Sequence, residues 1–472
     1  MTGYKTPADS YKTAILCNKS AIFDCGSIRR NGVLPMKVFL QNFGCKVNAI
    51  ETDGIAALLV QHGWTVCTKP QEADAIILNS CTVTASGDHR MLTALRKLRR
   101  SSPHAAIVLT GCYVQAFPQD AAALRDADIL VGTKERTKIP MLLEEFLQSR
   151  TPCKAVSPYE KGDAFEALPQ GTDTGHTRAF LKIQDGCNRF CAYCIIPYAR
   201  GRCRSRELAD IAAQANALAE RGYREIVLCG INLACYGQEQ GLTIADAVDA
   251  CAMAGFERVR LGSLEPDGLT NEVLTRLAAN SAFCPQFHIS LQSGCDKILR
   301  AMHRHYSCAE YAALLGRIRA LFPLCAVTTD IMTGFPGETE EDFAQTLAFV
   351  QEMKFSKIHI FRYSRRPGTL ADGMPDQVAE SVKKERADRL SALEQKLHEE
   401  FLQSRIGQTV SVLFEREKDE DFHIGHAPDY TIVCIPSDGV GVSLRNRIFP
   451  VKITGVQGDR LYGEIDVSEK GL

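Results

Sequence analysis

The chain has 472 residues and a mass of 52.0 kDa, with 45% apolar and 24% charged residues, which excludes both a single small module and a wholly disordered chain. Lys and Arg total 55 against 56 Asp and Glu, so a uniformly basic nucleic-acid binder is excluded, although a local basic patch is not. No apolar run is long enough for a membrane span, and the N-terminus lacks the apolar core of a signal peptide, so we expect a cytoplasmic protein of roughly two to four domains without membrane contact.

The first third of the chain alternates strand and helix patterns. Residues 1–35 show no period and are expected to form an N-terminal extension. Over residues 36–150, continuous apolar runs typical of buried parallel strands alternate with helical patterns, which predicts a doubly wound α/β domain. We expect strands at 37–42, 75–79, 105–110 and 128–131, and helices at 51–62, 89–100 and 140–148.

The rest of the chain predicts a linker, a second βα domain and a small β domain. Residues 151–177 carry several Pro and Gly and little periodicity, which is typical of a linker. Residues 178–403 hold six strand patterns separated by helical ones, which favours a partial (βα)6 barrel. Residues 404–472 hold short, turn-bounded strand patterns and predict a small OB-like β-barrel. The expected strands are 179–184, 225–229, 258–262, 286–291, 326–332 and 357–363, then 410–414, 431–435, 447–454 and 460–466. The expected helices lie near 207–221, 243–254, 270–280, 307–321, 339–353 and 378–403.

One cysteine motif carries a specific chemical signal. Cys187, Cys191 and Cys194 are spaced C-x3-C-x2-C directly after the first strand of the second βα unit, where active sites of βα barrels are built. Three thiolates on one loop can hold three irons of a [4Fe–4S] cluster and leave the fourth iron open to a ligand. The alternatives are scattered thiols or a zinc site completed by Cys203, although zinc sites usually pair their cysteines as C-x2-C.

A second group of three cysteines is spread over the first domain. Cys45, Cys81 and Cys112 each end a predicted strand, and the carboxyl ends of parallel strands share one edge of a sheet. Buried cysteines near strand ends are common, but three at equivalent places predict a second three-cysteine cluster site. The other cysteines among the nineteen show no pair spacing and are interpreted as reduced structural thiols.

The C-x3-C-x2-C loop resembles that of the radical S-adenosylmethionine (SAM) enzymes. In that family the open iron binds the amino and carboxylate groups of SAM, and an electron from the cluster cleaves SAM to methionine and a 5′-deoxyadenosyl radical. Two cluster sites, on a flavodoxin-like half followed by a radical SAM half, resemble the methylthiotransferases over residues 36–472. The resemblance implies two [4Fe–4S] clusters and SAM as cofactors, held by the six cysteines, with Cys187, Cys191 and Cys194 catalytic.

Two segments resemble one branch of that family. Residues 44–48, Gly-Cys-Lys-Val-Asn, are similar to the GCKVN of the branch that acts on threonylcarbamoyladenosine in tRNA, and residues 425–430, Gly-His-Ala-Pro-Asp-Tyr, to a GHT-x-NY element in its tail. The resemblance implies a sulfur-group transferase that abstracts the C2 hydrogen of N6-threonylcarbamoyladenosine at position 37 and adds a methylthio group there. The alternatives are isopentenyladenosine 37, an aspartate of a ribosomal protein, or a non-catalytic Fe–S protein that binds RNA or senses redox state.

Other residues at predicted strand ends line up with the same family. The resemblance implies that Glu265, Gln292 and Gly334 contact SAM or shape its pocket, although each could equally be a turn or cap residue. Arg200, Arg204 and Arg206 follow the cysteine loop and are expected to hold phosphates of the substrate, the alternative being solvated arginines.

The implied partners follow from the same resemblance. The C-terminal module resembles the TRAM RNA-binding domain, yet acidic residues outnumber basic ones in it, so binding is expected on one face, near Arg445, Arg447 and Lys452. A tRNA anticodon loop suits such an enzyme because its bases can be splayed out into a buried site. We also expect a monomer that takes its electron from flavodoxin or ferredoxin.

Overall fold

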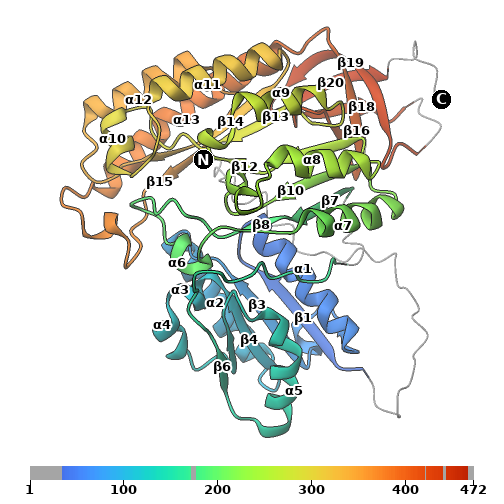
Figure 1. The fold of residues 1–472 in the computed structure, drawn as a ribbon, viewed down its shortest axis with the longest axis vertical. Helices are drawn as coiled ribbons and strands as arrows, with labels where there is room; N and C mark the ends of the chain where they lie inside the picture. The colour runs from blue at the N-terminus through green and yellow to red at the C-terminus, as the bar shows by residue number, and fades with distance from the viewer. Residues whose placement is uncertain (1–34, 172–176, 420, 439–442, 466–472) are drawn as a thin grey trace. The chain divides into compact units, whose positions relative to one another are not determined.

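The computed structural model describes residues 35–171, 177–419, 421–438 and 443–465 (Figure 1), so the expected extension over 1–35 lies outside the described residues except for its last one. The chain divides into two compact units. Unit 1 comprises Met1–Lys161, Glu166–Thr172 and Tyr198–Arg200, and unit 2 comprises Gly162–Phe165, Asp173–Pro197 and Gly201–Leu472. Within the described ranges, no helix combines the length and the apolar character needed to cross a membrane.

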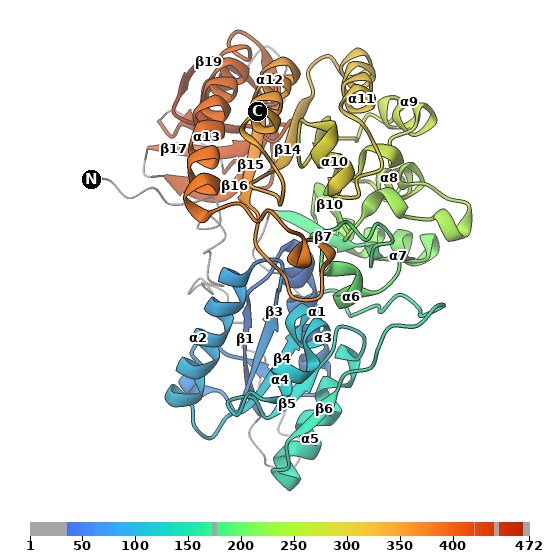
Figure 2. The ribbon, with the colours of Figure 1, turned by 90° about the vertical axis from the view of Figure 1, so that its left-hand side faces the viewer.

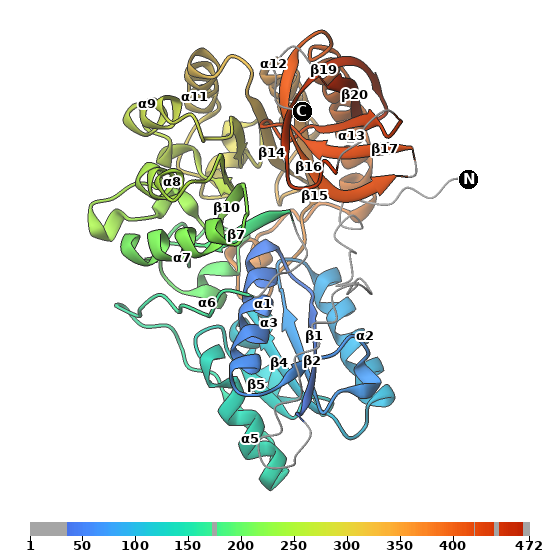
Figure 3. The ribbon, with the colours of Figure 1, turned by 90° about the vertical axis from the view of Figure 1, so that its right-hand side faces the viewer.

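Unit 1 is built on a parallel sheet with the strand order β2-β1-β3-β4-β5-β6, the order of flavodoxin-like folds. Alternate residues of each central strand face opposite sides, so Ile77 shares an apolar cluster with Ile55 of α1, and Ile76 shares another with Met91 of α2. The two helices accordingly lie on opposite faces of the sheet (Figure 3). The strands are β1 (Lys37–Asn42), β2 (Thr65–Val66), β3 (Ala75–Ser80), β4 (Ala106–Gly111), β5 (Ile129–Val131) and β6 (Cys153–Ala155). The helices are α1 (Lys46–Gln61), α2 (Ala85–Ser101), α3 (Cys112–Ala116), α4 (Pro118–Ala122) and α5 (Ile139–Ser149), with short 3-10 turns η2 (Pro70–Glu72) and η3 (Arg136–Lys138).

The α/β class of this half is confirmed, with three local corrections. The expected linker is not irregular from its start, because β6 pairs with β5 at the edge of the sheet. β2, α3 and α4 were not predicted, since two to five residues carry too little periodicity. The first helix begins at residue 46 rather than 51, because its first turn buries the polar side chain of Asn48 and so lacks an amphipathic pattern.

The described part of unit 2 contains seven parallel strands in two sheets, β7-β10-β11 and β12-β13-β14-β15. They correspond to the six expected strands of a partial βα barrel, because β11 and β12 together occupy the place of one expected strand. Only Gly262 separates β11 from β12, and the helices lie outside the curved strand layer (Figure 2). The strands are β7 (Arg178–Lys182), β10 (Glu225–Cys229), β11 (Arg258–Leu261), β12 (Ser263–Leu264), β13 (Gln286–Ile289), β14 (Ala326–Thr333) and β15 (Lys357–Arg362), with the small pair β8 (Gln184–Asp185) and β9 (Arg204–Ser205). The helices are α6 (Ile196–Arg200, whose last residues belong to unit 1), α7 (Leu208–Glu220), α8 (Ile244–Met253), α9 (Asn271–Ala279), α10 (Asp296–Ala301), α11 (Cys308–Leu321), α12 (Glu340–Met353) and α13 (Glu380–Gln403), with 3-10 turns η4 (Leu233–Cys235), η5 (Gln238–Gln240), η6 (Pro266–Gly268) and η7 (Leu370–Gly373).

A closed barrel of order β16-β17-β18-β20-β19 ends the chain, which confirms the small β-barrel. Its core contains Val412, Phe414, Val433, Ile435 and Val451. The strands are β16 (Thr409–Asp419), β17 (Phe422–His426), β18 (Ile432–Pro436), β19 (Ile448–Gln457) and β20 (Arg460–Ile465). β17 was missed because its sequence, Phe-His-Ile-Gly-His, is short and contains a Gly, a residue depleted in strands.

The barrel joins the βα part of unit 2 through a buried layer of charges. Glu225 on β10 lies between its neighbours Arg178 and Arg258 on the adjacent strands. Its Oε1 accepts a hydrogen bond from Nε of Arg260 at 3.0 Å and forms an ion pair with Arg178, whose Nε lies 2.9 Å away. Tyr430 has a backbone φ of 72°. The guanidinium carbons of Arg178 and Arg260 lie 5.0 and 4.6 Å from the centroid of its ring. The 425–430 element therefore helps to dock the barrel.

Candidate functional site: two sets of three cysteines

Three cysteines lie at the carboxyl edge of the sheet in unit 1. Cys45 is the N-cap of α1 directly after β1, Cys81 follows β3, and Cys112 begins α3 after β4. These three strands are neighbours at the point where the strand order reverses, which is where doubly wound sheets bind ligands. The thiols lie within one another's electrostatic reach, because burial, followed by the nearby Cys112 and Cys45, raises the pKa of Cys81 to about 12.

A buried amide network holds the first turn of α1 against the carboxyl end of β3. Nδ2 of Asn48 donates to the carbonyl of Ser80 at 3.1 Å and to Oδ1 of Asn79 at 3.2 Å. The thiol of Cys45 donates to Oδ1 of Asn48 at 3.3 Å. All three network residues are at most 1% exposed, so each bond forms in a low dielectric where an unpaired amide is costly. The Asn of the Gly-Cys-Lys-Val-Asn segment thus positions Cys45.

We expect Gly111→Ala to disrupt this edge. Gly111 has a φ of 102°, and a Cβ there would lie 2.3 Å from the carbonyl oxygen of Ser80. Left-handed strain and the backbone clash together predict a loss of roughly 2–5 kcal/mol in the free energy of unfolding. Gly63, with a φ of 86° and open space around it, is the matched control, because Gly63→Ala adds only the strain of about 1–2 kcal/mol. Urea denaturation of both variants measures the difference, and equal losses would contradict the clash.

A buried arginine completes the unit 1 site. Arg200 is fully buried, and its Nε donates to the sulfur of Cys112 at 3.2 Å. Its Nη1 and Nη2 form a fork with the carboxylate of Glu51, the Nη2–Oε2 distance being 2.9 Å. Glu51 also pairs with Arg136, Nη1 to Oε2 at 2.5 Å. Two buried cations, Arg200 and Arg136, therefore share one buried carboxylate beside the thiol of Cys112.

The second set lies on the loop after β8 in unit 2, on the carboxyl side of the βα strands. Cys191 is buried, and Cys187 and Cys194 are partly exposed. The loop is tied to two other segments, because the amide of Ala192 donates to the carbonyl of Met302 at 3.0 Å and its carbonyl accepts from the amide of Ala371 at 2.7 Å. These backbone bonds hold the three thiols on one small surface.

Several donors point at the sulfurs of this loop. The sulfur of Cys187 accepts from Nδ2 of Asn232 at 3.6 Å, and that of Cys191 accepts from Nη1 of Arg304 at 3.3 Å. Burial raises the pKa of Cys187 to about 11, and burial followed by the charge of Cys191 raises the pKa of Cys194. The thiols therefore oppose one another's ionisation until a cation joins them.

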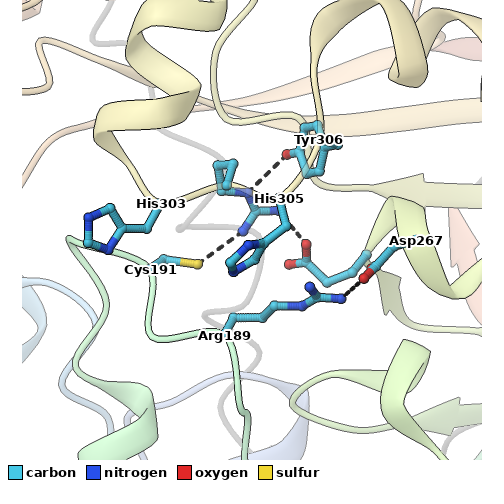
Figure 4. Close-up of a pocket in the computed structure, with 8 residues that line it drawn as sticks. Arg189, Cys191, Asp267, His303, His305 and Tyr306 are labelled. Carbon is cyan, nitrogen blue, oxygen red and sulfur yellow. Dashed lines mark hydrogen bonds and ion pairs between the residues drawn. The ribbon is translucent and has the colours of Figure 1, made fainter.

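A pocket opens beside Cys191 (Figure 4). Its sulfur points toward the middle of the pocket, and Arg189 pairs there with Asp267. The remaining lining is Glu265, His303, Arg304, His305 and Tyr306. The pocket thus joins the cysteine loop to the segment after β12 and to the loop between α10 and α11.

The three residues expected around SAM all follow strands of unit 2. Glu265 lines the pocket and forms an ion pair with Arg304. Gln292 extends the sheet beyond β13 in a left-handed conformation, φ 70°, and its amide donates to the carbonyl of Asp330 at 2.8 Å. Gly334 is packed against α13, since a Cβ there would lie 2.2 Å from Cγ of Lys383. Contact of these residues with SAM stays a prediction.

The arginines after the cysteine loop are buried and engaged by carboxylates. Arg200 forks onto Glu51, as described above. Arg204 lies 3.6 Å from Oδ2 of Asp185, and Nε of Arg206 donates to Oδ2 of Asp210 at 2.6 Å. A role in holding substrate phosphates stays a prediction, and it would require these ion pairs to open.

Both cysteine sets suit iron–sulfur clusters by the chemistry of their donors. Within the described ranges, no three His, Cys, Asp or Glu side chains converge as a single-ion site, and a cluster does not require this, because each cysteine binds a different iron. In each set charges on neighbouring thiols oppose one another, and positive iron would relieve that repulsion. In unit 2 the buried Oδ1 of Asn232 has no hydrogen-bond partner among the described residues, so it can accept from an amino group such as that of SAM.

The sequence analysis assigns no functional role to Arg304 or to Asn232. Arg304 lies 113 residues from the cysteine it contacts, in a loop between α10 and α11, and no spacing rule links them. Asn232 directly follows a strand end, a position at which βα proteins place functional side chains, so that signal was present.

Comparisons with known proteins match both halves. The model of the radical SAM superfamily matches residues 181–350, and that of an uncharacterised protein family, UPF0004, matches residues 37–132. Among solved structures, the radical SAM methyltransferase TsrM of Kitasatospora setae, with cobalamin and a [4Fe–4S] cluster bound, has a TM-score of 0.53 at 16% identity over 72% of this chain and 77% of that one, a likeness of fold.

Three curated relatives match over most of their length. The chain is 37% identical to threonylcarbamoyladenosine tRNA methylthiotransferase MtaB of Bacillus subtilis, covering 87% of this chain and 93% of that protein. It is 36% identical to the MtaB of Aquifex aeolicus, covering 81% and 93%. It is also 34% identical to tRNA-2-methylthio-N(6)-dimethylallyladenosine synthase of Pelotomaculum thermopropionicum, covering 89% and 96%.

Proposed function

The chain belongs to the radical SAM methylthiotransferases that act on tRNA, and on that premise we propose that it adds a methylthio group to C2 of N6-threonylcarbamoyladenosine at position 37. The observation that carries the proposal is the pair of three-cysteine sets, one at the carboxyl edge of each parallel sheet. An unactivated aromatic C–H bond is far too weak an acid for side-chain bases, so a site with a radical source and a second cysteine set suits sulfur insertion there.

The choice of acceptor rests on sequence more than on geometry. Relatives named for threonylcarbamoyladenosine reach 37% and 36% identity, against 34% for one named for dimethylallyladenosine. Asn48 and its amide network position Cys45 and would serve any branch. Lys46 and Val47 carry the branch resemblance, and Lys46 is exposed beside Cys45, where it can meet an anionic substrate.

Each residue set has a defined task in this proposal. Cys187, Cys191 and Cys194 hold the SAM-binding cluster, and Cys45, Cys81 and Cys112 hold a second cluster that carries or delivers sulfur. A cluster held by Cys187, Cys191 and Cys194 would supply the reducing electron for SAM cleavage and so the radical chemistry needed at C2 of the substrate. The chain positions these groups: Asn232 and Arg304 hold the sulfurs of Cys187 and Cys191 in place.

The proposed RNA contacts lie on surfaces that the structure leaves exposed. Arg445, Arg447 and Lys452 of the C-terminal barrel are exposed and can contact phosphates of the anticodon arm. Flavodoxin or ferredoxin is the proposed electron donor, and the proposed state is a cytoplasmic monomer.

Nucleoside mass spectrometry of tRNA tests the proposed acceptor. In cells deleted for this gene, 2-methylthio-threonylcarbamoyladenosine is expected to disappear while its unmethylthiolated precursor accumulates. Expression of the intact chain should restore the product, and Cys187→Ala should not. The matched control is Cys153→Ala, on the edge strand β6 and outside both cysteine sets, which should restore it fully.

The second candidate acceptor is dimethylallyladenosine, favoured by the relative named for that nucleoside. Loss of its methylthio derivative, with the threonylcarbamoyl product unchanged, would reassign the acceptor and leave the chemistry intact. No change in any methylthio nucleoside, in a strain without a redundant enzyme, would contradict the tRNA proposal and favour a ribosomal-protein aspartate or a sensor role.

A further inference from the structure

The two cysteine sets share an arrangement of a hydrogen bond and an ion pair that their sequences do not predict. In each set, one cysteine sulfur accepts a hydrogen bond from a buried arginine, and that arginine is also paired with a glutamate. Arg304 contacts Cys191 and Glu265 in unit 2, and Arg200 contacts Cys112 and Glu51 in unit 1. The arginines are 113 and 88 residues from their cysteines in sequence, so the arrangement arises only in the fold.

Four contacts hold the guanidinium of Arg304 in place. Nη1 donates to the sulfur of Cys191 at 3.3 Å, Nη2 donates to the carboxylate of Glu265 and to the carbonyl of Ser290 at 3.3 Å, and Nε donates to the hydroxyl of Tyr306 at 3.0 Å. The side chain is only 3% exposed. A guanidinium fixed in this way cannot turn to water, so its N–H remains directed at the sulfur.

Arg200 is fixed more tightly still. Its side chain is 0% exposed, its two Nη atoms fork onto Glu51, and Nε is left to donate to Cys112. Glu51 is itself held by Arg136. The carboxylate therefore orients the guanidinium in both sites. The sulfur accepts from a guanidinium N–H that does not bond to the carboxylate.

We propose that Arg304 and Arg200 are positioning residues that raise the reduction potential of the cluster bound at each cysteine set, through the N–H···S bond to Cys191 and to Cys112. The inference rests on the proposed function, since it requires a cluster at each set. Reduction places one more electron on the iron and sulfur atoms, and a cationic donor at a coordinating sulfur stabilises that added charge. The electron comes from an external reductant, and the guanidinium keeps all its protons because arginine does not titrate in this range.

The sign and size of the effect follow from the same argument. Without the donor, the reduced form loses more stabilisation than the oxidised form, so the potential becomes more negative. A hydrogen bond to a charged group is worth about tenfold or more in an equilibrium constant, and a tenfold change corresponds to about 59 mV for a one-electron couple. Because only the difference between the two oxidation states shifts the potential, we expect Arg304→Gln to lower the midpoint potential by up to about 59 mV, the value for a tenfold difference.

The experiment is a redox titration followed by electron paramagnetic resonance of the full-length reconstituted protein. The background is Cys45→Ala, Cys81→Ala and Cys112→Ala, which leaves a single cluster. Arg304→Gln removes the charge and the guanidinium that reaches the sulfur, and Arg304→Lys keeps the charge without the planar fork, so its potential should lie between Gln and the parent. The matched control is Arg189→Gln, since Arg189 lines the same pocket and its guanidinium pairs with Asp267, and it should shift the potential less than Arg304→Gln.

The mirror experiment uses Arg200→Gln with Cys187, Cys191 and Cys194 replaced by Ala. The role of the arginines would be overturned if the potentials of the Arg304 or Arg200 variants lay within error of the parent. It would also be overturned if Arg189→Gln shifted the potential as much as Arg304→Gln. If Arg304→Gln loses its cluster on purification, Arg304→Lys decides the question, and an unshifted potential there also overturns it. A parent protein that takes up no cluster at Cys187, Cys191 and Cys194 would instead contradict the proposed function.

Discussion

Replacement of Cys191 by Ala is expected to lower the reductive cleavage of SAM by more than about 100-fold, because the loss of even an outer partner of a metal ligand costs about 10–100-fold. Cys191 is buried in the middle of the loop, and its sulfur faces the pocket. The measurement is the yield of 5′-deoxyadenosine from the reconstituted protein with dithionite, together with iron content.

The control for this prediction is Cys203→Ala. Cys203 also lies close to the loop, but its thiol is hydrogen-bonded to that of Cys235, so iron content and SAM cleavage should stay near those of the parent. Equal loss in both variants would show that Cys203 is a fourth ligand, which would favour the zinc alternative over a cluster with an open iron.

Glu225→Ala is expected to lower the free energy of unfolding by about 3–5 kcal/mol, the range for breaking a buried ion pair from one side. The substitution would leave Arg178, Arg258 and Arg260, each at most 10% exposed, without the carboxylate that they share. Since this layer docks the C-terminal barrel, the barrel should also become more sensitive to limited proteolysis. Urea denaturation and digestion of the apo protein measure the two effects.

An exposed pair on the same side of the domain provides the control. Glu257 pairs with Arg224, and both are more than 40% exposed, so Glu257→Ala should cost at most about 1 kcal/mol. A loss as small in Glu225→Ala would contradict the role of the buried layer.

The same layer predicts a pH dependence. Burial alone would raise the pKa of Glu225, but Arg260, Arg178 and Arg258 outweigh it and lower the pKa from 4.5 to about 2. A carboxyl whose pKa is lower in the folded than in the unfolded chain stabilises the fold fully above the unfolded value. The difference in unfolding free energy between parent and Glu225→Ala should therefore be constant near neutrality and shrink as the pH falls from about 4.5 towards 2. A difference that does not change over this range would contradict the shift.

The elements that sequence predicts well are those whose burial is uniform or clearly one-sided. β3 and β4 are buried at every position and appear as plain apolar runs, and most helices of unit 2 begin and end within about two residues of the expected range because their caps are conventional. The prediction of α1 misses its first turn because the residues that face the site, Asn48 and Glu51, are polar. Functional demands on that turn override the hydrophobic pattern by which helices are recognised.

The candidate site was predictable where the ligands are chemically distinctive. Cysteines at strand ends stand out in a sequence, and the parallel topology brings each set to one edge. The arginines do not stand out, because arginine is common and the partner is distant. Arg200 pairs with Glu51, a contact that sequence did not predict, and its expected role toward phosphate stays a prediction, while Arg304 carried no expectation. The residues that hydrogen-bond to a ligating cysteine depend on tertiary packing, which neither the spacing nor the periodicity of the sequence predicts.

The assignment of Tyr198–Arg200 to unit 1 bears on how such a chain can evolve. A gene segment for residues 36–150 does not encode a self-sufficient module, because it lacks the arginine that forks onto Glu51 and contacts Cys112. A recombination event that exchanged the N-terminal half alone would bring in a foreign Glu51 and keep the resident Arg200, so the two must remain compatible. We therefore expect these halves to be inherited together, and chimaeras between branches to succeed when residues 198–200 are exchanged along with the N-terminal half.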